Sequence, residues 1–191
     1  MRGFLAGVIL TLIAFPIAVG WYAGSRHMPV AAADPPLMFE RKLARTALHA
    51  RIDREAPKRD SASFNAPDLA SGAGIYVKDC AFCHGMPGQP PSVAGKGMFP
   101  EAPQLFDPKE MVTDDPVGVT FWKVQNGIRL TGMPGFKSAL SDAQMWQVSA
   151  MLARADQLPA EAKEVLNQAA APAAVPIVPL GSPANPQANP R

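Results

Sequence analysis

The chain has 191 residues, enough for one ordinary domain with extensions, and its formal net charge is only +2. Its Lys and Arg residues form no large block around aromatic residues, which excludes a nucleic-acid interface of the usual kind. Twelve of the 21 prolines lie outside residues 65–158, where they indicate linkers and a tail. The sequence therefore predicts one folded domain in the middle, with an extension on each side.

The first clear pattern is an uncharged apolar segment at residues 3–24. At 1.5 Å per residue this segment spans about 33 Å, enough to cross a hydrocarbon core of about 30 Å. A membrane helix tolerates a proline such as Pro16. We expect residues 1–25 to form a transmembrane anchor. The alternative is a signal peptide, because the alanines at 31–33 offer small residues for a processing site.

Residues 26–64 are expected to hold an amphipathic helix and a linker. Within residues 37–54, five apolar residues recur near a helical period, with charged residues on the other face. They are Phe39, Leu43, Ala47, Leu48 and Ile52. The basic residues of this helix could meet anionic headgroups or an acidic partner, but a solvated face is the simpler interpretation.

Residues 65–158 are expected to form the folded domain, and the patterns in it are helical. A first helix begins at a cap signal at Asn65 and runs to Cys80. A second spans about residues 113–127, between acidic start signals and an Asn–Gly stop. A third begins with a capping-box pattern at Ser141. Because no alternating strand pattern occurs in this region, the sequence predicts an all-α fold.

Two further segments are predicted to be irregular. Residues 85–112 are rich in Gly and Pro and should form a long loop, which inside a compact domain normally has a function such as wrapping a cofactor. Residues 159–191 are expected to hold a short weak helix and then a disordered tail rich in Pro and Ala.

The chain has two cysteines, Cys80 and Cys83, which are spaced CxxC and followed at once by His84. A disulfide between them would close too small a loop to stabilise the fold much. The CxxCH pattern is typical of c-type haem attachment, in which two thiols form thioethers with the haem and the histidine reaches the iron. The sequence therefore predicts one haem c, bound covalently through Cys80 and Cys83, with His84 as an iron ligand.

Two other kinds of site share part of this pattern. A thioredoxin-like dithiol is expected near a βαβ pattern, whereas these cysteines end a helix and precede a Gly/Pro-rich loop. A zinc site needs further ligands, and the other histidines, His27 and His49, lie beside the membrane segment and in the linker helix. Haem attachment is therefore the preferred interpretation.

The second axial ligand decides whether the iron carries electrons or binds a substrate. Of nine methionines, Met133 is the candidate, because it lies in a loop between two predicted helices with Gly132 and Pro134 beside it. Met98, in another Gly/Pro-rich loop, is its rival. Ligation by His84 and Met133 would fill both axial positions and favour electron transfer.

These motifs resemble the class I monohaem cytochromes c, in particular the small domains that serve as electron-donor subunits of bacterial respiratory oxidases and dehydrogenases. The resemblance covers about residues 65–158 and rests on four motifs in the family order. They are GAGIYVKDCAFCHG at 72–85, PQL at 103–105, NGIRLTGMPGF at 126–136 and LSDAQMWQVSAML at 140–152. It implies three or four helices around one covalently bound haem, behind the N-terminal transmembrane helix.

The resemblance also assigns roles to individual residues. It implies that the backbone carbonyl of Pro103 accepts a hydrogen bond from Nδ1–H of His84, and that Leu105 packs on the haem. It implies further that Gly72 and Tyr76 of the first domain helix cross the last helix. The loop between His84 and Pro103 is longer than in the most compact members of the family.

Bacterial haem attachment takes place outside the cytoplasmic membrane, so the resemblance implies a single-pass protein of that membrane with its haem domain on the periplasmic side. We expect a one-electron carrier rather than an enzyme, with respiratory-chain redox proteins as partners and neither a small-molecule substrate nor nucleic acid. Two alternatives stay open: a subunit of a larger oxidase or dehydrogenase, and, less favoured, a haem enzyme or gas sensor with open iron. Lys123, Arg129 and Lys137, near Met133, are a candidate docking rim.

Overall fold

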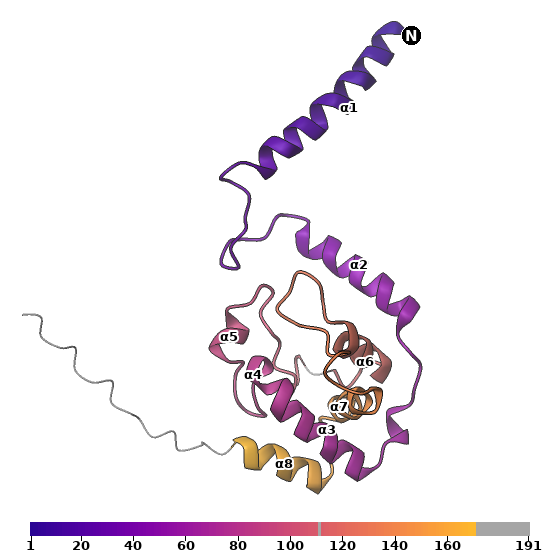
Figure 1. Ribbon diagram of the computed structural model, residues 1–191, viewed down its shortest axis with the longest axis vertical. Coiled ribbons are helices and arrows are strands. Elements are labelled where there is room, and N and C mark those ends of the chain that lie inside the picture. The colour runs from indigo at the N-terminus through magenta and orange to yellow at the C-terminus, as the bar shows by residue number, and fades with distance from the viewer. Residues whose placement is uncertain (111, 171–191) are drawn as a thin grey trace, which may run out of the picture.

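The computed structural model describes residues 1–110 and 112–170, and within these residues every regular element is a helix. Figure 1 shows one long N-terminal helix that stands away from a bundle of shorter helices and loops. The all-α fold predicted from the sequence is confirmed. The tail expected after residue 170 lies outside the described residues.

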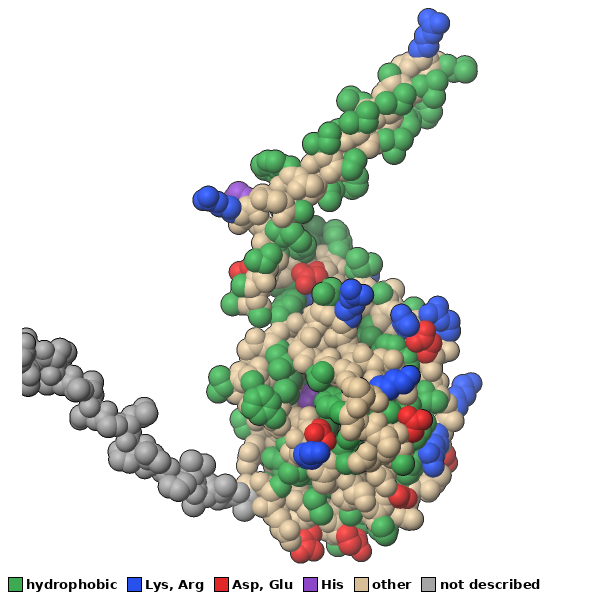
Figure 2. Space-filling view, in the orientation of Figure 1, with side chains coloured by type: hydrophobic (Ala, Val, Ile, Leu, Met, Phe, Trp, Pro, Cys, Tyr) green, Lys and Arg blue, Asp and Glu red, His purple; other side chains and the backbone are tan. Residues whose placement is uncertain are grey.

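The N-terminal helix, α1 (Arg2–Ala23), agrees with the predicted membrane segment. An 18-residue window of this helix has a mean hydropathy of 2.3, and none of it is buried. Figure 2 shows hydrophobic side chains along its length and Lys or Arg side chains near its two ends. It is therefore long and apolar enough to cross a membrane, and Pro16 lies inside it without ending it.

The second helix, α2 (Glu40–Glu55), lies between α1 and the rest of the bundle (Figure 1). The single apolar face predicted for this segment is divided in the structure. Ile52 is buried and Leu48 half-buried, whereas Phe39 and Leu43 are 68% and 71% exposed. The reason is that α2 packs on the bundle chiefly through its contact with α6 (Val117–Asn126).

The segment that leaves α2 is fixed to the bundle rather than free. The indole N–H of Trp122 in α6 donates a hydrogen bond to the Glu55 carboxylate at 3.1 Å. Pro57 lies with its carbonyl against Gly118, where a Cβ atom would have no room. The Arg59 guanidinium lies over the ring of Phe64, 4.3 Å from its centroid. A short 3-10 helix, η1 (Ser61–Ser63), completes the connection.

Two capped helices, α3 (Ala66–Asp79) and α7 (Asp142–Ala153), cross at the centre of the bundle. Asn65 and Asp68 form a capping box for α3, and Ser141 and Gln144 form the predicted one for α7. The largest completely buried side chains come from these two helices: Leu69, Tyr76, Met145, Val148, Ser149 and Met151. The last helix, α8 (Ala160–Ala170), packs along α3 at the position where a weak helix was expected.

The crossing depends on Gly72. A Cβ atom there would lie against the backbone carbonyl of Gln147 and 2.9 Å from Cβ of Met151. Only glycine therefore lets the two backbones approach so closely. The approach of Gly72 to α7, the helix of Trp146, was expected from the family resemblance and is confirmed, and Tyr76 one turn later is completely buried.

Two short helices lie in the segments that surround the cysteines. One is α4 (Ala81–His84), which follows α3 almost directly. The other is α5 (Val93–Lys96), which lies inside the long loop predicted for residues 85–112 and contacts α4. Ser92 caps α5 by accepting a hydrogen bond from the backbone N–H of Gly95 at 3.1 Å.

We predict that Gly72→Ala lowers the free energy of unfolding by about 1–3 kcal/mol, because the added methyl group overpacks the helix crossing. Gly74→Ala is the matched control, since a Cβ atom there meets nothing within 4 Å. Gly74→Ala should raise stability by about 0.5–1 kcal/mol through lower chain entropy. Thermal unfolding followed by circular dichroism checks both variants, and equal midpoints would contradict this account of the crossing.

Candidate haem site

Cys80 joins α3 to α4, and Cys83 and His84 lie in α4, so the three residues share one helical turn. The backbone N–H groups of Cys83 and His84 both donate to the carbonyl of Cys80 at 3.0 Å. Spacings of three and four residues bring side chains to the same side of such a turn. Both cysteines are free thiols, so both are available for thioether bonds.

The imidazole of His84 is oriented by a backbone carbonyl. Nδ1 of His84 lies 2.7 Å from the carbonyl oxygen of Pro103, and since a carbonyl only accepts, Nδ1 must carry the proton. Nε2 therefore keeps a free lone pair for a metal. Burial lowers the pKa of His84, while the bond to Pro103 opposes this shift, and the net result favours the neutral ring that binds iron.

The thiol of Cys80 lacks the lowered pKa of a dithiol-exchange site. Burial, together with the negative charges of Asp79 and of a Cys83 thiolate, raises its pKa to about 12. The reactive cysteine of a thioredoxin-like site has a lowered pKa, because the thiolate is the attacking species. The alternative of a redox dithiol is thereby disfavoured.

The loop that carries Pro103 is held by Gln104, a residue whose role was missed from the sequence. Its side-chain NH₂ group donates to the carbonyls of Met86 at 2.6 Å and Gln89 at 2.9 Å. Its side-chain oxygen accepts from the backbone N–H of Asp107 at 3.1 Å. One amide thus joins both ends of the long loop. The available signal was a glutamine between Pro103 and Leu105 in a Gly/Pro-rich segment.

Two further contacts support the CxxCH turn from the core side. The Tyr76 hydroxyl donates a buried hydrogen bond to the carbonyl of Gly85 at 2.7 Å. The rings of Tyr76 and Phe106 meet edge to face, with centroids 5.1 Å apart. Leu105, predicted to pack on the haem, is partly buried against the same core cluster.

Met133 lies in a loop whose backbone is well fixed. Its carbonyl accepts from the N–H of Ile128 at 3.2 Å, and its own N–H donates to Thr131 Oγ1 at 3.1 Å. At the start of this loop Gly127 adopts a positive φ of 67°, and a Cβ atom there would lie 2.8 Å from the carbonyl oxygen of Met133. The Met133 side chain is partly buried against the core.

The rival methionine, Met98, is a neighbour of the Met133 loop. A Cβ atom on Gly132 would lie 2.7 Å from Cγ of Met98, so this side chain packs directly against the residue before Met133. The structure therefore brings both candidate ligands together on adjoining loops. The choice of Met133 over Met98 stays a prediction.

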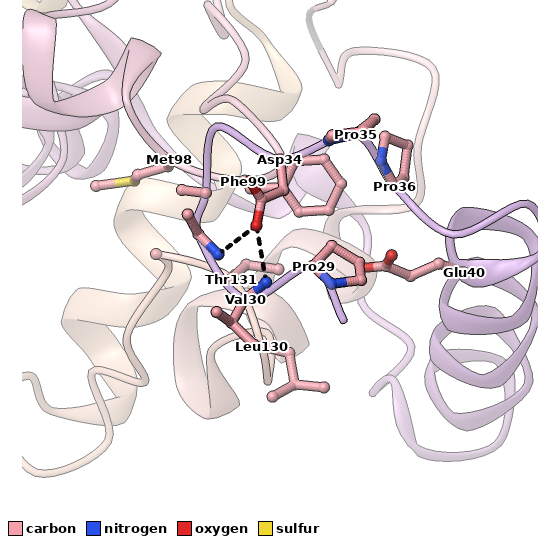
Figure 3. A pocket seen from close by; sticks show the side chains of 13 residues that line it. Pro29, Val30, Asp34, Pro35, Pro36, Glu40, Met98, Phe99, Leu130 and Thr131 are labelled. Carbon is pink, nitrogen blue, oxygen red and sulfur yellow. Dashed lines mark hydrogen bonds between the residues drawn. The ribbon is translucent and has the colours of Figure 1, made fainter. Parts of the chain in front are cut away.

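Residues 29–36, which we call the strap, pass over these two loops between α1 and α2. A cavity of about 360 Å³ lies between the strap and the loops. Its walls include Pro29, Val30, Asp34, Pro35 and Pro36 of the strap, and Met98, Phe99, Leu130, Thr131 and Gly132 (Figure 3). The Asp34 carboxylate accepts hydrogen bonds from the backbone N–H groups of Val30 and Ala31, each at 2.9 Å, which close the strap into a turn.

The candidate docking rim is only partly available to a partner. Lys123 pairs with Asp115 at 3.5 Å, and 27% of its side chain is exposed. Arg129 and Lys137 are exposed. The three residues stay a candidate surface, with Lys123 already engaged inside the domain.

The residues present fit a c-type haem. Two free thiols and one oriented, neutral imidazole share a turn, and thioether side chains lie on the two loops near the strap. This donor set is typical of haem iron ligated by His and Met. Within residues 1–110 and 112–170, no group of three or more His, Cys, Asp or Glu could hold a bare metal ion, so the zinc alternative gains no further ligands there.

Comparison with known proteins identifies the same region. The family model described as cytochrome C oxidase, cbb3-type, subunit III matches residues 67–152, which run from the first turn of α3 to the last turn of α7. Neither the curated proteins nor the solved structures gave a match. The matched region contains the CxxCH turn, the Pro103 loop and both methionine loops. Residues 67–152 are therefore a cytochrome c domain, which follows an N-terminal helix able to anchor it in a membrane.

Proposed function

We propose that this protein carries one electron at a time through a single low-spin haem c, attached at Cys80 and Cys83 and ligated by His84 and Met133. Its setting is a bacterial, membrane-associated respiratory chain, whose redox proteins are its partners. The observation that carries the proposal is the hydrogen bond from His84 to Pro103 on a turn with two free thiols. When bound, the haem supplies an iron that gains and loses one electron.

The chain's own residues keep the ligands in place while the charge changes. The Pro103 carbonyl holds the His84 ring in one tautomer and orientation, and strengthens it as a ligand. Gln104 holds the Pro103 loop, and the Ile128 and Thr131 contacts hold the backbone of Met133. A protein whose ligands hardly move between oxidation states suits electron transfer better than substrate binding.

We place the haem domain on the periplasmic side of the cytoplasmic membrane. Two observations support this proposal: α1 is able to cross a membrane, and a cytochrome c domain follows it. Attachment of c-type haem in bacteria takes place outside the cytoplasmic membrane, as the family resemblance implies. The start of the chain would then face the cytoplasm.

A second candidate is a fixed subunit of a larger oxidase. The matched family model is described as a subunit of a cbb3-type cytochrome c oxidase, which favours this possibility. Gentle solubilisation of membranes followed by native electrophoresis separates the two: a carrier runs alone, whereas a subunit runs with a complex. An open-iron enzyme or sensor is less favoured, because the chain's other histidines, His27 and His49, both precede the matched region.

We predict that Met133→Ala abolishes the weak far-red absorption band of an iron–methionine sulfur bond and lowers the reduction potential, since loss of the thioether ligand destabilises the ferrous form. Met98→Ala is the matched control, because Met98 lies against the same loop. It should keep both the band and the potential. Absorption spectra of the oxidised and reduced proteins check this, and loss of the band in Met98→Ala alone would assign the ligand to Met98.

A separate test concerns Gln104, which holds the loop whose Pro103 carbonyl bonds to His84. Gln104→Ala should lower stability by about 1–3 kcal/mol, because the carbonyls of Met86 and Gln89 lose their donor. Gln104→Glu keeps an acceptor but cannot donate when ionised, so it should be destabilising as well. Thermal unfolding of the haem-loaded protein measures both. Wild-type stability in Gln104→Glu would show that the donated bonds contribute nothing.

A further inference from the structure

The start of α2 exposes an unusual group of apolar side chains. Leu37, Met38, Phe39 and Leu43 are 43%, 86%, 68% and 71% exposed. Single exposed apolar residues are ordinary on a protein surface, but four within seven residues form a patch that normally marks a contact. This patch lies outside residues 67–152, so the cytochrome c domain itself does not account for it.

Helix geometry places Phe39 and Leu43 of this patch away from the domain. Residues spaced by three or four lie on one side of a helix. Phe39, Leu43, Ala47 and Ala50 follow that spacing, and all four are exposed. We call this side the outer face of α2. The opposite side holds the half-buried Leu48 and the buried Ile52, and α2 as a whole lies on the side of the bundle from which α1 projects (Figure 1).

Positive charge accompanies the apolar patch. Arg41, Lys42 and Arg45 lie in the first half of α2, and residues 41–52 contain no acidic side chain. Among the described residues the ion pairs of α2 are Arg51 and Arg54 with Glu55, at its other end. Figure 2 shows Lys and Arg side chains gathered on the α2 side of the domain.

The Arg41 guanidinium lies over the ring of Phe99, 5.4 Å from its centroid. By the same spacing, Arg45 lies on the side of Leu48 and Ile52. Lys42 is therefore the basic residue beside the outer face that is available to anionic groups.

The connection to α1 limits where this patch can lie. Only residues 24–39 separate α1 from α2, and they are not fully extended. The Asp34 turn shortens the connection, and the strap lines one cavity together with Met98 and Leu130 of the domain. If α1 crosses a bilayer, the outer face of α2 must lie close to the surface of that bilayer.

We propose that the outer face of α2 binds the surface of the membrane that α1 crosses. Phe39 and Leu43, with Met38, enter the boundary between headgroups and acyl chains, and Lys42 contacts anionic headgroups. This inference rests on the proposed insertion of α1. Such a contact holds the domain in one orientation, because α2 is itself fixed to α6 through Glu55 and Trp122.

The test uses the full-length, haem-loaded protein in lipid nanodiscs of phosphatidylcholine with a minor fraction of phosphatidylglycerol. Hydrogen–deuterium exchange is measured on peptides that cover residues 38–47. In these discs the wild type should exchange several-fold more slowly than Phe39→Glu/Leu43→Glu. Glutamate in the first helical turn favours the helix, so faster exchange in the variant would reflect lost lipid contact. Equal exchange in both proteins would overturn the proposal.

Val93→Glu is the matched control, because it places the same charge on a side chain that is 90% exposed but lies in α5. It should leave exchange at residues 38–47 unchanged. A second variant replaces Lys42 with Gln. It should lose the extra protection of anionic over pure phosphatidylcholine discs, which is about fivefold for one basic residue. Protection that appears only after an acidic protein is added would assign the face to that protein and overturn the proposal.

Two readouts separate this inference from the proposals it builds on. Retention of each variant in carbonate-washed membranes reports on α1, and the haem absorption spectrum reports on the electron-transfer site. Wild-type protein that washes out of membranes would remove the basis for a lipid contact. Normal retention and a normal spectrum, together with unprotected residues 38–47, would overturn the α2 contact alone.

Discussion

A hydrogen bond of 2.7 Å joins the His84 imidazole to the carbonyl of Pro103, 19 residues further along the chain. It fixes which nitrogen of the ring is free, and so determines what the CxxCH turn can bind. The long loop from residue 85 onward must fold back to supply that carbonyl, and Gln104 holds it there by bonding to Met86 and Gln89. The close crossing of α3 and α7 at Gly72 holds α3 in place, and Cys80 lies at the C-terminal end of α3.

Much of this arrangement could be predicted from the sequence, because several signals act locally. The capping box at Ser141 and the Asn65 cap stabilise helix ends through neighbouring backbone groups, so α7 and α3 begin where expected. The CxxCH spacing likewise defines a single turn. The role of Gln104 was missed because its partners lie 15 and 18 residues away and are backbone carbonyls, which carry no side-chain signature.

The helix α2 shows that the spacing of apolar residues predicts a helix but not the surroundings of each side. The spacing of Phe39, Leu43, Leu48 and Ile52 correctly indicates a helix, but periodicity does not say what each side meets. Here Ile52 packs inward, while Phe39 and Leu43 point into solvent in the absence of a membrane. A segment that divides its apolar residues between two environments shows a weaker single-face pattern than a core helix. Its exposed side fits the membrane contact proposed for α2.

The central claim is that one haem, with both axial positions filled, carries one electron. A potentiometric titration of the full-length protein, followed by haem absorption under nitrogen and then under carbon monoxide, tests it most directly. The account predicts a single reversible one-electron transition at a potential raised by methionine ligation, unchanged by carbon monoxide. A second transition, or a large shift under carbon monoxide, would contradict it by revealing another haem or an open iron site.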